Sequence, residues 1–208
     1  MKHLYIILLC LPLIGFGQGW EQTFGGDSED TGHSVQQTTD GGYIISGFTS
    51  SFGSSGNVYL IKTDVNGEEE WFQTFGGTGG GYSTGGYSVQ QTIDGGYIIT
   101  GRYNTDVYLV KTNENGEEEW FQTFGGPVLD EGYSVQQTED GGYIITGKTT
   151  SFGNGYEDVY LVKTDSNGNE EWFQTFGGTQ NDYGRSVQQT DDGGYIITGF
   201  TVSFGNVN

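Results

Sequence analysis

Paired glutamines are the polar side chains that recur most regularly in this sequence. They lie in the run Ser-Val-Gln-Gln-Thr, which occurs four times. An amide both donates and accepts hydrogen bonds, so glutamines around a central channel would suit the hydroxyl groups of a sugar. The same amides could bond to neighbouring repeats, and we favour this structural role because every copy carries both residues. The candidate ligand-facing residues are Gln36, Gln90, Gln136 and Gln188.

Tryptophan is the second residue type with a fixed place. Each of the four tryptophans begins the run Trp-x-Gln-Thr-Phe-Gly-Gly. An exposed indole could stack on a sugar ring, but a fixed place beside a predicted turn favours packing between repeats. The residues predicted to pack in this way are Trp20, Trp71, Trp120 and Trp172.

Runs of glutamate precede three of the tryptophans, at residues 68–70, 117–119 and 170–171. Their carboxylates could bind calcium, which prefers oxygen ligands. Alternation along a strand would, however, send neighbouring glutamates to opposite faces. We therefore expect a solvated strand edge, where charge discourages edge-to-edge pairing, and no cofactor. Calcium is the metal that these runs would suit best.

Residues that break the repeat are the place to look for catalysis, because an enzyme needs its acid, base or nucleophile in one unit only. The one-off features are His33, Arg102-Tyr103, Lys148, and the segments 79–86 and 127–129. They form no recognisable dyad or triad, and no carboxylate pair stands out as a glycosidase pair. We expect a protein without catalytic activity; if it is an enzyme, it is a glycoside hydrolase.

The elements that position these residues are short strands. The glutamine runs begin segments 33–38, 87–92, 133–138 and 185–190, and each is followed by Asp-Gly-Gly-Tyr-Ile-Ile. A second half, with a Val-Tyr-Leu run, a Gly-containing turn and the tryptophan run, occurs three times. Short pieces rich in β-branched and aromatic residues and bounded by Gly, Asn and Asp predict strands. Asp-x-Asn-Gly, as at residues 64–67, predicts hairpin turns between them.

The predicted fold is all-β, with about four repeats of roughly 50 residues, each a blade of four antiparallel strands. Apolar residues on both faces of the middle strands require cover on both sides, which stacked blades provide. We count 15 strands, one short of a closed four-bladed ring, and so expect an open arc or incomplete ring. The predicted repeat region is 18–208, with units at about 27–77, 78–126, 127–178 and an incomplete 179–208.

The first 17 residues and the charge indicate export. A weakly basic start, an apolar stretch and Gly15-Phe16-Gly17 predict a signal peptide over residues 1–17. No segment is long and apolar enough to span a membrane. The net charge of −20 and the scattered basic residues exclude a nucleic-acid binder. We expect a secreted or cell-surface protein whose partner is an extracellular glycan or surface protein.

The repeat resembles the bacterial β-propeller repeat family, on the residues Asp40 to Ser50 and on the Lys-Thr-Asp-Val-Asn-Gly turn at 62–67. The resemblance covers nearly all of residues 20–208. It implies an exported protein of Bacteroidetes-like bacteria, with further blades or a sorting domain in a longer chain. The segment 64–71 is also similar to the tryptophan-docking motif of quinoprotein propellers and to bulb-type lectin repeats, but the lectins' sugar-binding pattern does not occur. Neither a quinone cofactor nor a mannose site is carried over. The resulting expectation is a non-catalytic binding or spacer module, with a carbohydrate-binding module or part of a glycan-degrading hydrolase as the alternative.

Overall fold

A computed structural model describes residues 19–53, 56–76 and 84–204, and these residues form strands and turns without a helix. The predicted signal peptide lies outside the described residues. The first sheet contains β1 (Asp30–Gln37), β2 (Tyr43–Thr49), β3 (Asn57–Thr63) and β4 (Glu69–Phe75). The second contains β5 (Gly85–Gln91), β6 (Tyr97–Tyr103), β7 (Asp106–Thr112) and β8 (Glu118–Phe124). The third contains β9 (Asp130–Gln137), β10 (Tyr143–Thr149), β11 (Asp158–Thr164) and β12 (Glu170–Phe176). The fourth contains β13 (Asp182–Gln189) and β14 (Tyr195–Thr201).

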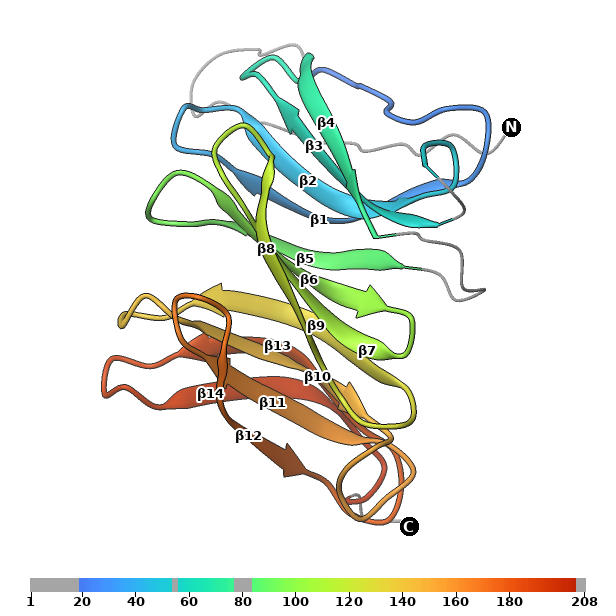
Figure 1. The fold of residues 1–208 in the computed structure, drawn as a ribbon, viewed down its shortest axis with the longest axis vertical. Coiled ribbons are helices and arrows are strands. Elements are labelled where there is room, and N and C mark those ends of the chain that lie inside the picture. The colour runs from blue at the N-terminus through green and yellow to red at the C-terminus, as the bar shows by residue number, and fades with distance from the viewer. Residues whose placement is uncertain (1–18, 54–55, 77–83, 205–208) are drawn as a thin grey trace.

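Every sheet is an antiparallel meander in which each strand pairs with the next along the chain. The first three sheets follow one another in chain order along the long axis of the molecule, and β13 and β14 lie beside the third sheet (Figure 1). The first strands of the four sheets, β1, β5, β9 and β13, contact one another from sheet to sheet. The array is open and β-propeller-like, which confirms the predicted fold class.

The hairpin turns follow the chemistry of their residues. In the turn after β3, the Oδ1 atom of Asp64 accepts hydrogen bonds from the backbone N–H groups of Asn66 and Glu68 at 2.8 and 2.9 Å. Gly67 closes the turn with a φ of 82°. This left-handed conformation is one that glycine adopts at little cost. The Asp-x-Asn-Gly segments therefore form the predicted turns.

The apolar core lies between successive sheets. Val58, Leu60 and Phe75 of the first sheet pack with Val89 and Ile99 of the second, and all five are almost fully buried. The same kind of cluster joins the second sheet to the third. The second sheet is covered on both faces by its neighbours, so its middle strands can be apolar on both sides.

Each complete sheet also contains a buried lysine, although the sequence analysis does not single these residues out. The Lys62 ammonium lies 2.8 Å from an Asp40 oxygen and 2.9 Å from a Glu70 oxygen, and its side chain is only 4% exposed. Lys111 and Lys163 make equivalent pairs in the next two sheets. Burial opposes the charge of Lys62, but the two carboxylates outweigh it and raise its pKa. A buried charge with two partners is thus part of every complete sheet.

The aspartates of these pairs should make stability sensitive to acid. The hydrogen bonds from Lys62 and Thr38 lower the pKa of Asp40 to about 2, and those from Thr138 and Lys163 do the same for Asp140. An unfolded aspartate has a pKa of about 3.9, so these groups stabilise the fold fully above about pH 4, and the effect is lost as the pH falls through about 2.

We expect the double variant Asp40→Asn/Asp140→Asn to be less stable at pH 7 and to show a flatter dependence of unfolding free energy on pH between about 4 and 2. Urea unfolding at a series of pH values measures this. Asp192→Asn is the matched control, because within the described residues Asp192 has no ion-pair partner. An equal effect of Asp192→Asn would contradict the role assigned to the lysines.

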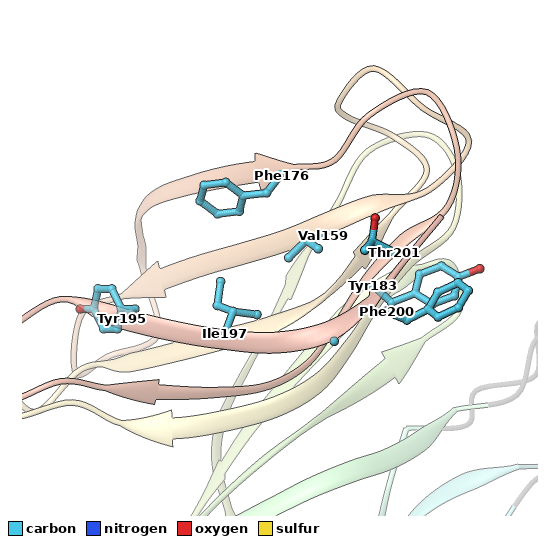
Figure 2. Close-up of a pocket in the computed structure, with 8 residues that line it drawn as sticks. Val159, Phe176, Tyr183, Tyr195, Ile197, Phe200 and Thr201 are labelled. Atoms are coloured by element: carbon cyan, nitrogen blue, oxygen red, sulfur yellow. The ribbon is translucent and has the colours of Figure 1, made fainter. Parts of the chain in front are cut away.

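The fourth sheet has two strands, and this leaves an apolar surface on the third. Phe176 ends β12 and is 49% exposed, whereas the equivalent Phe75 and Phe124 are each 6% exposed. Figure 2 shows Phe176 and Val159 facing Ile197 across a hollow of about 430 Å³. In the preceding pairs of sheets, the third strand of the following sheet contributes to this cluster with residues such as Tyr108 and Val110.

The first tryptophan segment corrects the predicted strand count. The segment 20–26 is the first of the 15 predicted strands, but the structure describes 14 strands and only one bridge residue, Gln22, in this segment. A strand needs a neighbour to supply its ladder of hydrogen bonds, and none of the four sheets that the structure describes includes this segment. Its side chains nevertheless pack on the first sheet, through Trp20 and Phe24.

Candidate functional site

The glutamine pairs connect the first strands of neighbouring sheets. The Oε1 atom of Gln36 accepts a hydrogen bond from the backbone N–H of Gln91 at 2.6 Å. In return, the Oε1 atom of Gln91 accepts from the backbone N–H of Thr39 at 2.9 Å. Gln90 and Gln136 repeat the first contact with the N–H groups of Gln137 and Gln189. The carbonyl oxygens of three predicted ligand-facing glutamines are therefore bound between sheets.

A groove runs beside these contacts. Its volume is about 670 Å³, and it crosses the first three sheets. Gln36 and Gln90 line it, together with the second glutamine of three pairs and the residues of the turns that follow. The structure does not bring Gln136 and Gln188 into this lining, and Gln188 is exposed on β13. Three of the four amides, those of Gln36, Gln90 and Gln136, thus form an inter-sheet row rather than a common ring.

Removing one amide should show how much the inter-sheet row of glutamines contributes to the stability of the fold. We expect Gln90→Ala to lower the free energy of unfolding by about 1–2 kcal/mol, because the N–H of Gln137 loses its acceptor. Gln188→Ala should leave stability nearly unchanged, since no acceptor or donor for its amide lies among the described residues. Urea denaturation of both variants makes the comparison; equal losses would show that the inter-sheet bond is not the cause.

The tryptophans lie at contacts between sheets. Trp71 meets Tyr97 of the second sheet edge to face, with ring centroids 5.8 Å apart. Trp120 makes the same contact with Tyr143, and Trp172 a tilted one with Tyr195. The indole also covers a turn glycine of the next sheet: a Cβ atom built on Gly168 would lie 2.5 Å from Trp120. An indole held in this way is not free to stack on a ligand.

The glutamate runs do not follow plain strand alternation, because Glu70, Glu119 and Glu171 each lie at an irregularity in the pairing of their strand with the one before it. One glutamate of each run, Glu70, Glu119 or Glu171, pairs with the buried lysine of its sheet. Within residues 19–53, 56–76 and 84–204, no group of three or more acidic, histidine or cysteine side chains is placed to hold a metal ion.

Residues that break the repeat come together near the start of β9 and the end of β10. Glu131 accepts ion pairs from Arg102 at 2.9 Å and from Lys148 at 3.2 Å. Lys148 also pairs with Glu157 at 2.6 Å, and Glu157 accepts a hydrogen bond from the Tyr183 hydroxyl. Three units of the sequence, the second, third and fourth, therefore contribute unlike residues to one network. We call these five residues the charged network.

Burial and pairing set the charges in this network. Burial disfavours ionisation of Glu157, but the hydrogen bonds from Lys148 and Tyr183 outweigh it and lower the pKa of Glu157. Burial likewise opposes the charge of Lys148, yet the two glutamates raise its pKa. Glu157 and Lys148 are therefore both charged at neutral pH, and each stabilises the charge of the other.

A row of flat side chains borders the network. His33 meets the ring of Tyr87 at 5.2 Å between centroids, and Tyr87 meets Tyr133 at 5.8 Å. The guanidinium of Arg185 lies 4.6 Å from the Tyr133 ring centroid. These four residues occupy the same position in the first strand of the four sheets, and we call them the aromatic row.

Sequence reasoning noted His33, Arg102 and Lys148 as exceptions to the repeat but did not connect them. The usable signal was the variation at one repeat position, where histidine, tyrosine, tyrosine and arginine precede Ser-Val-Gln-Gln. Glu131 and Glu157 carry no such signal, because acidic residues are common throughout the chain.

The fold and these contacts define an open β-propeller-like array whose repeated side chains hold the sheets together. No protein-family model matches the chain, and no curated protein matches it. Among solved structures, a protein of unknown function from Bacteroides caccae is similar, with a TM-score of 0.52 and 16% sequence identity. The match covers 86% of this chain and 56% of that one, and it shows the fold alone. In the described part of the chain, no helix is long and apolar enough to cross a membrane.

Proposed function

We propose that this protein is an exported, non-catalytic module that binds an extracellular partner or spaces other parts of a surface protein. The observation that supports the proposal best is the use of the repeated polar residues. Glutamines bond from sheet to sheet and lysines pair inside each sheet. Side chains engaged in this way build a scaffold and are not available as acids, bases or nucleophiles.

Export rests on the sequence of residues 1–17 and on the acidic composition. Membership of the bacterial β-propeller repeat family belongs to the same proposal. It is supported by the recurring Asp-Gly-Gly-Tyr and Asp-x-Asn-Gly turns and by the likeness of fold to the Bacteroides protein. Expression in a Bacteroidetes host and fractionation of the culture would test it: protein retained in the cytoplasm would contradict export.

Carbohydrate binding is the second candidate function, and the glutamine groove favours it. The Oε1 atoms of Gln36 and Gln90 are bound between sheets, but their Nε2 groups donate no hydrogen bond within the described residues. These N–H groups at the groove can donate to sugar hydroxyls. An open, polar groove across repeated sheets suits an extended chain better than a small enclosed ligand.

A glycan array of neutral and acidic oligosaccharides, probed with the mature protein, tests this second function. We expect binding at micromolar to millimolar concentration without release of shorter products. Absence of binding to any glycan at millimolar concentration would remove the carbohydrate function and leave the spacer role. Turnover of a bound oligosaccharide, abolished by replacing one carboxylate, would overturn the non-catalytic proposal.

A further inference from the structure

Arg185 differs from every other basic residue that the structure describes. Lys62, Lys111 and Lys163 each pair with two carboxylates inside a sheet, and Arg102 and Lys148 pair with glutamates of the charged network. Arg185 has no ion pair and no hydrogen bond to any described residue. The full sequence has 27 acidic residues, yet no carboxylate of the described residues pairs with this guanidinium.

The surroundings hold this guanidinium in place. It lies 4.6 Å from the ring centroid of Tyr133 and 5.4 Å from that of Tyr183. Contact with two aromatic rings restricts the side chain while its five N–H donors stay unused. Arg185 itself is exposed on β13. A planar guanidinium that is fixed, exposed and unpaired suits two parallel hydrogen bonds to a carboxylate.

The nearby carboxylates do not compete for Arg185. Glu131 is held by Arg102, by Lys148 and by the Tyr133 hydroxyl at 2.7 Å. Glu157 is held by Lys148 and the Tyr183 hydroxyl. Arg102 and Lys148 are thus paired with the two glutamates, whereas Arg185 has no carboxylate partner among the described residues. Carboxylates farther from Arg185 than the Debye length of about 8 Å are largely screened at physiological salt and repel an anion only weakly.

The aromatic row supplies a second recognition element beside the cation. His33, Tyr87 and Tyr133 continue it across three sheets; His33 is exposed, whereas Tyr87 and Tyr133 are half-buried and pack against each other. His33 and Tyr87 line a hollow of about 230 Å³ at its far end, together with Glu29. Aromatic side chains offer apolar area at low entropic cost, which suits the C–H faces of pyranose rings. A row of rings that ends in an unpaired guanidinium thus matches a chain of sugar rings that carry carboxylates.

We propose that the aromatic row binds an acidic oligosaccharide and that Arg185 binds the carboxylate of one of its uronate residues. The inference rests on the proposed carbohydrate-binding function and names a different place from the glutamine groove. Tyr87 and Gln90 are three residues apart on β5, about 10 Å along the strand, so the aromatic row and the glutamine groove lie along the same first strands of the sheets.

Calorimetric titration of the mature protein with tetragalacturonate, and with its neutral methyl ester, tests the proposal. We expect the acid to bind more tightly than the ester and its affinity to fall as salt is added. Arg185→Tyr should weaken binding of the acid roughly 10- to 100-fold, the value of a charged hydrogen-bond pair, with little effect on the ester. Arg185→Lys keeps the charge but not the paired donors, so its affinity for the acid should lie between those of the unsubstituted protein and Arg185→Tyr.

Arg185→Tyr is also the control for folding, because tyrosine occupies this position in the second and third units. Its thermal unfolding should match that of the unsubstituted protein. Equal binding of acid and ester, or unchanged affinity in Arg185→Tyr, would overturn the carboxylate site while leaving carbohydrate binding standing. Equal binding of tetraglutamate would overturn the assignment to a sugar. Failure of the acid to bind at millimolar concentration would also overturn the inference, whereas the proposed function is judged separately by the neutral glycans of the array.

Discussion

Replacing Gly168 by alanine is expected to lower the free energy of unfolding by about 2–5 kcal/mol. Gly168 has a φ of 78°, where a side chain costs about 1–2 kcal/mol. Its new Cβ would also lie 2.5 Å from Cζ3 of Trp120, and a packed indole cannot move aside without losing its own contacts. Such overpacking adds about 1–3 kcal/mol. Chemical denaturation monitored by tryptophan fluorescence measures the sum.

Gly141→Ala separates the two costs. Gly141 has a similar φ of 84°, but nothing lies within 4 Å of the Cβ that alanine would add. It should therefore show the backbone cost alone. The double variant Gly168→Ala/Trp120→Ala should be more stable than the two single losses predict, because removing the indole removes the clash. Equal losses for Gly168→Ala and Gly141→Ala would show that the tryptophan contact has no part in the effect.

Phe124→Ala is expected to cost about 3–5 kcal/mol, whereas Phe176→Ala should cost about 1 kcal/mol or less. The two residues occupy equivalent places at the ends of β8 and β12. Phe124 is 6% exposed in the core between the second and third sheets, so its removal leaves a cavity. Phe176 is 49% exposed beside the two-stranded fourth sheet, so alanine there removes little buried area.

Phe124 and Phe176 are the same residue at the same repeat position, so a difference between the two alanine variants reflects burial and not residue type. Thermal and urea unfolding of both variants give the difference directly. A cost for Phe176→Ala that equals that for Phe124→Ala would mean that the apolar surface around Phe176 is covered in solution. Analytical ultracentrifugation of the unsubstituted protein would then identify a second copy as the cover.

The sequence was sufficient for the parts of the fold that local chemistry determines. Asp64 and Gly67 specify their hairpin without help from the rest of the chain. Strand alternation, in contrast, did not predict the pairing irregularity at Glu70, Glu119 and Glu171. Residues 20–24 have the composition of a strand but form only one bridge, because pairing depends on a neighbour and not on composition.

The candidate sites could not be predicted from the sequence, because their residues meet only in the folded structure. Lys62 looks like a surface residue in its strand, and its pairing with Asp40 depends on the fold of two hairpins. Arg185 meets Tyr133 through the packing of two sheets, across 52 positions of sequence, so no spacing rule connects them. For the glutamines, the recurrence is visible in the sequence, but the sequence does not show which groups their side chains bond to.

The contact of each tryptophan with the following sheet has a consequence for assembly. Trp71 reaches forward to Gly116, and Trp120 reaches forward to Gly168, so a sheet uses different surfaces toward its two neighbours. Such interfaces are heterologous, because the two sheets in contact present different surfaces to each other. The same rotation and translation relate each sheet to the next, and a pair of sheets is not closed by a two-fold axis. The array therefore has a direction and a handedness, and a change made in every tryptophan contact would alter its curvature by a fixed increment per repeat.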